Sequence, residues 1–337
     1  MNSLIARMSA VLFFALIPLV QYVVPGMAQA PQGIRAFVTN FDGESVSVID
    51  PQSGQVVASI KTGLKPHGVT IAPDGNAVYV SNEGDDDLVI IDPGKNEILA
   101  KVKVGRSPNQ IEVSADGKYV FVTLNQDDAV AVVDTSQRKV AKIVPIGRAP
   151  HITLRSPDGK RIYVTSEGDM KLVALDSGTW QVTGETPLFA MPRVLAMLSD
   201  GKKIYQTIRW LNGALIIDPS RNQVVDRIAL GEPKFAPEGK DAHGLAVTPD
   251  GTQVWISTQT TDEVTIISTK DKRVLARVRV GHDPNWIGFT PDGKLAVISN
   301  TGSSDVSIVN VTQRRVINTV KVVTSPKRLS VGTVSVR

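Results

Sequence analysis

The segment PDGNAVYVSNEGDDDLVII (residues 73–91) contains the pattern that decides the fold. A Pro-Asp-Gly turn precedes alternating apolar residues at Ala77–Ser81, and a polar loop leads to a second apolar run at Leu88–Ile91. This alternation, rich in β-branched residues, predicts two strands. Asp-Gly suits the hairpin turn because glycine takes a positive φ without steric cost. Two further runs, Val69–Ile71 and Ile98–Val102, complete a unit of four short strands.

The unit recurs with a period of 42 residues, so that Val38–Asn40 superimposes on Val80–Asn82. The Asp-Gly turn returns at Asp116-Gly117, Asp158-Gly159, Asp200-Gly201, Asp250-Gly251 and Asp292-Gly293. The aspartates that end the third strands are predicted to cap turns: Asp50, Asp92, Asp134, Asp176 and Asp218. The stretch from 31 to 337 is close in length to seven such units with one insertion of 8. A four-stranded unit cannot bury both faces alone, so the repeat predicts an all-β, seven-bladed propeller.

The two ends of the chain predict how the ring closes. The repeat begins at a second strand, Arg35–Asn40, and ends with a first strand, Lys327–Val331, that no Asp-Gly turn follows. One blade must therefore join a C-terminal inner strand to three N-terminal strands. The single propeller domain is expected to span residues 31–337.

The N-terminus predicts export. A short positive segment that includes Arg7, an apolar stretch over Met8–Val24 and the small-x-small site Ala28-Gln29-Ala30 form the pattern of a signal peptide over residues 1–30. We predict cleavage after Ala30 and a periplasmic or secreted protein; an uncleaved anchor is the alternative, for which the apolar stretch is short. The chain has no cysteine, which excludes disulfides, thiolate metal sites and covalent c-type haem attachment.

The charge balance excludes a polyanion-binding protein. Arg7 is the one charged side chain before position 31, so the remainder has 36 Lys+Arg against 33 Asp+Glu, a net charge of +3. Such a small excess does not predict a nucleic-acid partner. We expect a monomer with no membrane span after signal cleavage.

The repeat resembles a known family. The segments AFVTN (36–40), VYVSN (78–82) and IYVTS (162–166), each followed by a strand of the type SVSVID, are similar to the YVTN β-propeller repeats. The resemblance covers essentially the whole predicted mature chain. It implies a secreted or surface propeller with seven blades. Members include surface-layer proteins, binding proteins and periplasmic companions of pyrroloquinoline-quinone-dependent oxidation systems.

The inner strand of each blade should line the central channel, so the residues that start these strands form a predicted ring at one end of it. The ring consists of His67, Asn109, His151, Arg193, His243, Asn285 and Lys327. Three of the four histidines of the chain share this position. Two interpretations stand: the imidazoles of His67, His151 and His243 bind zinc or copper, or they bond to neighbouring backbone.

Two unusual loops near the ring predict further contacts to a ligand. Eight extra residues separate the fourth and fifth units, in the loop 231–241 that contains Phe235; a second unusual loop contains Trp210. Both aromatic side chains could cover the ring. The insertion is equally compatible with a tolerated surface loop.

The charges around the ring favour a small ligand. Arg148 and Arg328 belong to a set of cations expected near the axis, whereas Glu83 and Glu167 belong to acidic loops expected at the rim. A basic centre inside an acidic rim would favour a small anion.

These observations predict a binding protein that holds a small anionic or metal-containing ligand, or a partner protein, at the ring. One alternative is a metal-assisted lyase or lactonase that uses the histidines. Another is a passive interaction scaffold, accessory to a periplasmic oxidation system. One residue does not fit its unit: Arg155 stands where other blades have Ile71 or Val113. Either that strand shifts by one residue or Arg155 has a buried partner.

Overall fold

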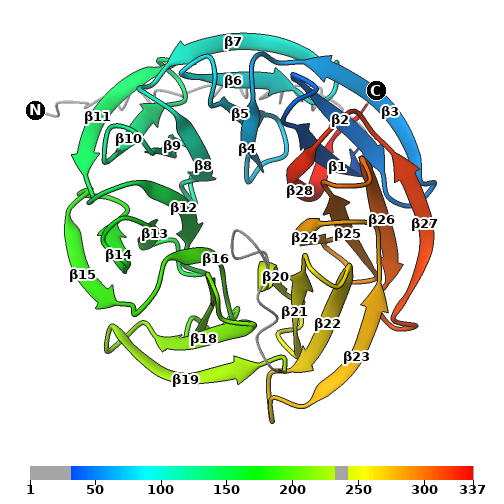
Figure 1. Cartoon of the computed structure of the whole chain (residues 1–337). Helices are drawn as coiled ribbons and strands as arrows, with labels where there is room; N and C mark the ends of the chain where they lie inside the picture. The colour runs from blue at the N-terminus through cyan, green and yellow to red at the C-terminus, as the bar shows by residue number, and fades with distance from the viewer. Residues whose placement is uncertain (1–31, 232–241, 337) are drawn as a thin grey trace, which may run out of the picture. The chain divides into compact units, whose positions relative to one another are not determined.

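The computed structural model describes residues 32–231 and 242–336, and these fold into seven sheets of four antiparallel strands arranged as a propeller (Figure 1). Each blade runs from an inner strand near the axis to an outer strand at the circumference. Blade 1 consists of β4 (Pro66–Ile71), β5 (Val78–Asn82), β6 (Asp87–Asp92) and β7 (Glu97–Lys103). Blade 2 consists of β8 (Pro108–Val113), β9 (Tyr119–Leu124), β10 (Ala129–Asp134) and β11 (Lys139–Pro145).

The following blades repeat this order. Blade 3 consists of β12 (Pro150–Arg155), β13 (Arg161–Ser166), β14 (Lys171–Asp176) and β15 (Val182–Pro187). Blade 4 consists of β16 (Pro192–Met197), β17 (Ile204–Ile208), β18 (Gly213–Asp218) and β19 (Gln223–Ala229). Blade 5 consists of β20 (Ala242–Val247), β21 (Gln253–Thr258), β22 (Glu263–Ser268) and β23 (Val274–Arg279). Blade 6 consists of β24 (Pro284–Phe289), β25 (Leu295–Asn300), β26 (Asp305–Asn310) and β27 (Arg315–Lys321).

Blade 7 confirms the predicted closure. Its strands are β28 (Pro326–Ser335), β1 (Gln32–Asn40), β2 (Ser45–Asp50) and β3 (Gln55–Lys61). β28 and β1 are longer than the sequence pattern indicates, since the pairing extends from Val38↔Leu329 to Gln32↔Ser335. In Figure 1 the red β28 lies beside the blue β1, so the two ends of the chain are joined within one sheet.

Apolar packing between blades forms the core. Seven clusters of buried side chains occur in the described residues, and each joins two consecutive blades. For example, Tyr79 and Leu88 of blade 1 pack with Ile111 and Val120 of blade 2. The second and third strands are buried almost throughout, whereas outer strands such as β7 are largely exposed. The ring is therefore stabilised by burial at every interface, without cysteine.

The turns behave as the sequence predicts. The glycines of the Asp-Gly turns have φ near +70°, for example +71° at Gly75 and +71° at Gly159. A Cβ at Gly75 would lie 2.6 Å from the carbonyl oxygen of Thr333, so this turn excludes larger residues. The carboxylate of Asp50 accepts hydrogen bonds from the backbone amides of Gln52 and Ser53, which confirms its capping role.

Arg155 is explained by a partner rather than by a shifted strand. Arg155 pairs with Ile162 in the same register that pairs Ile71 with Val78 in blade 1. Its backbone amide donates to the carboxylate of Glu112 at 3.3 Å, and the Arg155 charge opposes the rise that burial causes in the pKa of Glu112. No helix in the described ranges is long and apolar enough to cross a membrane. The predicted signal peptide lies outside the described residues and stays a prediction.

Candidate functional site

In five blades a hydroxyl of the second strand positions the ring residue of the next blade. The hydroxyl of Thr39 donates to the carbonyl oxygen of His67 at 2.9 Å, and that of Thr123 donates to the carbonyl oxygen of His151 at 3.0 Å. Thr207 does the same for His243 at 2.7 Å. The hydroxyl residue of the YVTN-like motif is thus a link between blades, and it fixes the backbone from which the ring side chains project.

Two ring histidines have a carboxylate partner. His67 Nδ1 lies 3.0 Å from Glu83 Oε2, and His151 Nδ1 lies 2.8 Å from Glu167 Oε1. The same Glu167 oxygen lies 3.2 Å from Nη1 of Arg193. The imidazole rings of His67 and His151 are neighbours, with centroids 5.6 Å apart. The prediction that both glutamates lie at the acidic rim is wrong; they belong to the centre, because the loop after the second strand turns back over the start of the first.

Arg328 lies among these groups. It is 2% exposed, and its Nη2 donates to His151 Nε2 at 3.1 Å while its Nη1 donates to Asn285 Oδ1 at 3.3 Å. Its guanidinium carbon lies 4.3 Å from the centroid of the Trp286 ring. Since arginine only donates, His151 Nε2 accepts and the proton is on Nδ1, toward Glu167.

The remaining ring residues surround this arrangement. His243 Nδ1 lies 3.0 Å from the carbonyl oxygen of Asn285, and the Asn109 amide donates to the carbonyl oxygen of Ser107 at 3.2 Å. Lys327 Nζ lies 3.2 Å from the centroid of the Phe41 ring, whose edge contacts His67. We use the name central cluster for the following residues: Phe41, His67, Glu83, His151, Glu167, Arg193, His243, Asn285, Trp286, Lys327 and Arg328.

Burial sets the protonation of the imidazoles. Burial, reinforced by the charge of Arg328, lowers the pKa of both His67 and His243 well below the usual value of a histidine. Burial also lowers the pKa of His151, although Glu167 beside it opposes the shift. The three rings are therefore neutral near pH 7.

The charged groups of the cluster keep their charges. Burial, followed by the charge of Arg328, lowers the pKa of Lys327 to about 8, and burial with Arg193 nearby lowers that of Arg328 to about 9. Burial alone would raise the pKa of Glu167, but His151 and Arg193 lower it to about 2. Among the residues of the central cluster, the three cations Arg193, Lys327 and Arg328 outnumber the two carboxylates Glu83 and Glu167 by one. Lys65, Arg209 and Asp42 lie near enough to interact with them.

The donor set does not fit the predicted zinc or copper site at His67, His151 and His243. In the ranges that the structure describes, no three His, Asp or Glu side chains are placed to hold a metal ion together. The reason is the guanidinium of Arg328, which donates to the Nε2 lone pair that His151 would offer to a metal. A cation therefore already lies beside His151 Nε2.

Of the predicted ligand-binding residues that the structure describes, Asn109, Arg148 and Trp210 are not part of the cluster. Arg148 is 72% exposed at the side chain and pairs with Asp169 at 2.7 Å, away from the ring. Trp210 is 55% exposed, and its ring lies beside Arg209 at 5.7 Å. Phe235 lies outside the described residues, so its predicted role as a lid stays a prediction.

A signal in the sequence could have located the two glutamates. Glu83 and Glu167 stand at the same spacing after the ring histidines His67 and His151, and two full repeats separate them. The residue at this place differs in other blades, for example Arg209 in blade 4 and Phe41 in blade 7. Arg328 directly follows a ring residue, and the sequence indicates it only as a cation near the axis, without a buried position.

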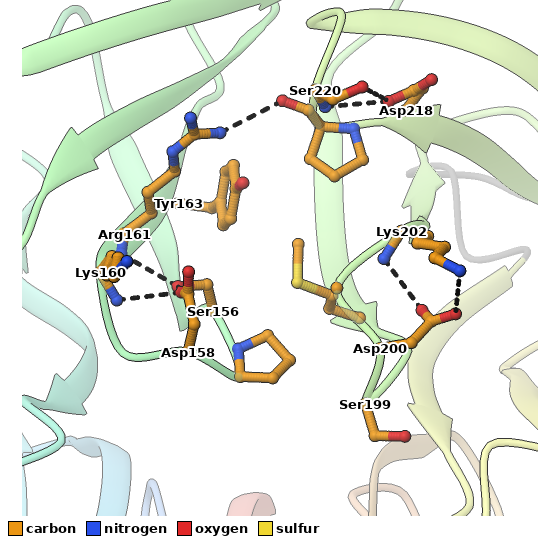
Figure 2. A pocket seen from close by; sticks show the side chains of 14 residues that line it. Ser156, Asp158, Lys160, Arg161, Tyr163, Ser199, Asp200, Lys202, Asp218 and Ser220 are labelled. Atoms are coloured by element: carbon orange, nitrogen blue, oxygen red, sulfur yellow. Dashed lines mark hydrogen bonds and ion pairs between the residues drawn. The ribbon is translucent and has the colours of Figure 1, made fainter.

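A cavity lies elsewhere, between blades 3 and 4 on the face of the Asp-Gly turns (Figure 2). Its volume is about 930 Å³. Its carboxylates bond to their own turns: Asp158 accepts from the Ser156 hydroxyl at 2.6 Å and Asp218 from the Ser220 hydroxyl at 2.6 Å. Because these groups stabilise local turns, the central cluster is the better candidate site.

Comparisons with known proteins agree with the fold. Residues 96–237 match the family model of YNCE-like β-propellers, and residues 35–146 match the model of the cytochrome D1 heme domain. No curated protein has a matching sequence.

Solved structures are similar over most of the chain. Hydrazine synthase from Kuenenia stuttgartiensis has a TM-score of 0.74 and 23% identity, over 81% of this chain and 91% of its own. Dihydro-heme d1 dehydrogenase NirN has a TM-score of 0.66 and 15% identity, over 88% of this chain and 74% of its own. A candidate 6-phosphogluconolactonase from Bacteroides fragilis has a TM-score of 0.73 and 15% identity, over 88% and 97%. At these identities the likeness establishes the fold, and with the repeat and the YNCE-like match at residues 96–237 it makes the chain a YVTN-like seven-bladed β-propeller.

Proposed function

We propose that the protein is an extracytoplasmic binding protein whose central cluster holds a small anionic ligand. One observation carries the proposal: three cations and two carboxylates meet in a cluster whose imidazoles are neutral. The excess positive charge lies largely out of water, where electrostatic attraction to an anion is stronger than at the surface. The signal peptide that the sequence predicts over residues 1–30 supports the proposed location.

The cluster draws on blades far apart in the sequence. Arg328 comes from the C-terminal strand, His151 from blade 3 and Asn285 from blade 6, yet hydrogen bonds connect all three. A rigid ring of this kind holds polar groups in fixed positions, as pre-formed ligand sites require. A partner protein would instead contact the exposed loops around the cluster.

Calorimetry on the exported chain without an affinity tag tests the proposal. Acetate, nitrate, methanesulfonate and phosphate are titrated as sodium salts, and tetramethylammonium chloride serves as the cationic control. We expect heat of binding with at least one anion and none with the cation. If no anion binds, the proposed function is wrong, and the result supports the alternative of a passive interaction scaffold. Intact mass of the exported protein, expected to begin at Pro31, tests the location.

A second candidate is a lactonase, and the His67–Glu83 pair is the observation that favours it. A carboxylate 3.0 Å from Nδ1 orients the imidazole, so that Nε2 is available to take a proton from water. The similar fold of the candidate 6-phosphogluconolactonase is an analogy of fold alone. Hydrolysis of small lactones that is lost in His67→Gln would support this function, whereas anion binding without turnover would support the first.

A further inference from the structure

The buried guanidinium of Arg328 differs from the other charged groups of the centre. Its side chain contacts neutral groups: His151 Nε2, Asn285 Oδ1 and the Trp286 ring. Within the described residues no carboxylate lies within 4.0 Å of it, whereas Arg193 has Glu167 at 3.2 Å. Its Nε is buried and has no hydrogen-bond partner there.

An arginine in this state is costly for the fold. A buried charge without a counter-charge destabilises a protein by several kcal/mol unless another group compensates it. Two neutral acceptors and one aromatic face compensate only part of this cost. A guanidinium that retains an unsatisfied N–H in such a place is suited to a ligand that brings the missing negative charge.

The contacts of Arg328 also restrict the chemistry of that ligand. Trp286 is stacked at 4.3 Å, and the two Nη atoms each use one hydrogen on a fixed acceptor. The groups left over are Nε–H and one hydrogen on each Nη, all in the guanidinium plane. Such in-plane donors pair with the oxygens of an oxyanion, whether a carboxylate or a tetrahedral anion.

Burial restricts the size. The side chain is 2% exposed, and His151 and Asn285 are also buried, at 6% and 8%. A ligand that reaches Nε therefore presents only a few atoms at this point. A single negative charge is enough, because the cluster has one cation in excess.

We propose that Arg328 is the recognition residue for a small oxyanion, either the carboxylate of a small organic acid or an inorganic oxyanion. This inference rests on the proposed function, since it names the ligand class of the same site. His151 and Asn285 act as positioning residues that hold the guanidinium in its plane.

The test compares oxyanions with a monatomic anion on the exported full chain. Acetate and nitrate distinguish an organic from an inorganic source, and bromide is a monoanion without oxygen atoms. We expect an oxyanion to bind at least about tenfold more tightly than bromide. Equal affinity for oxyanion and bromide would overturn the inference while the proposed anion site stands; the absence of any binding would overturn both.

Variants at Arg328 provide the second readout. Arg328→Met should abolish binding, and Arg328→Lys, which keeps the charge but loses the paired donors, should weaken it about tenfold or more. If Arg328→Met does not fold, as a thermal melt would show, Arg328→Lys decides alone. Arg106→Lys, at an exposed arginine of the same face, is the matched control and should bind as the wild type does. Wild-type affinity in a folded Arg328→Lys would overturn the proposal.

Discussion

The rim and the centre of the propeller use arginine and carboxylate in opposite ways. At the rim, Arg106 pairs with Asp127 at 2.5 Å and Arg148 pairs with Asp169 at 2.7 Å, in equivalent positions of blades 2 and 3. Both arginines are largely exposed, at 65% and 72% of the side chain. At the centre, Arg328 is buried and the blades do not repeat one another. The rim therefore reflects the repeat, whereas the centre reflects the particular sequence of each blade.

This difference shows which residues of a repeat protein to examine for function. Residues that recur at every 42nd position build turns, interfaces and exposed pairs, which each blade needs equally. The centre departs from that pattern blade by blade, with Glu167 beside His151, Arg209 in the equivalent place of blade 4, and Phe41 in that of blade 7. These blade-specific residues give the centre its excess of cations over carboxylates.

The largest expected effect comes from breaking a central ion pair. Glu167→Gln keeps the shape of the side chain but leaves Arg193, which is 17% exposed at the side chain, without its counter-charge. We expect the free energy of unfolding to fall by about 3–5 kcal/mol, measured by urea unfolding with tryptophan fluorescence. The rim control Asp169→Asn should shift the midpoint far less. Equal shifts in the two variants would contradict the distinction between rim and centre.

The pH dependence of stability sharpens the same comparison. The folded pKa of His67 and that of His243 lie well below their unfolded value, mainly because of burial, so the unfolded chain binds protons first as the pH falls. Stability is thus complete above about pH 6.5 and decreases below it, by up to about 1.4 kcal/mol per pH unit for each histidine. Glu167, with its pKa lowered to about 2, adds a further loss once the pH falls below about 4.5.

Urea unfolding at pH 7.5, 6.5 and 5.5 measures this effect. The double variant His67→Gln/His243→Gln should have a flatter profile between pH 6.5 and 5.5 than the wild type. A wild-type profile that does not change over this range would contradict the burial of the two imidazoles as neutral groups.

Most of the fold could be predicted from the sequence, because the same pattern of turns and apolar strand residues recurs in every blade. The Asp-Gly turns, the strand pattern and the closure by β28 all follow from the 42-residue period. The site could be predicted in part: His67 and His151 do meet at the ring position. Their pairing with Glu83 and Glu167 could not be predicted, because it depends on how the loop after the second strand folds over the axis.

The burial of Arg328 could not be read from the pattern either. The pairing of first and second strands is irregular at their start, with a shift between Pro150 and Thr153 in blade 3. Alternation therefore does not tell which side chain enters the centre. The width of the space at the axis also depends on how all seven interfaces pack. The sequence of a single blade does not predict this width.

A smaller loss of stability is expected at the second-strand hydroxyls that bond to the backbone of the ring residues. Thr123 is fully buried, and its hydroxyl donates to the carbonyl oxygens of His151 and Gln110 at 3.0 and 3.1 Å. Thr123→Val keeps the volume but leaves these acceptors without that donor, so we expect a loss of about 1–2 kcal/mol in urea unfolding. Thr123→Ser keeps the hydroxyl and should retain most of the stability. If both variants lose the same amount, the methyl group rather than the hydrogen bond is responsible.

The smallest effect should come from the rim itself. Arg106→Ala removes an exposed ion pair with Asp127, yet the backbone amide of residue 106 still donates to the same carboxylate. Exposed pairs contribute little because water and salt screen the charges, so we expect a change within about 0.5 kcal/mol. The difference from wild type should also shrink as sodium chloride is raised from about 0.05 to about 0.5 M. A salt-independent loss of the size expected for Glu167→Gln would mean that the rim pairs hold the blades together. The repeated exposed pairs would then contribute as much stability as the buried ion pair at the centre.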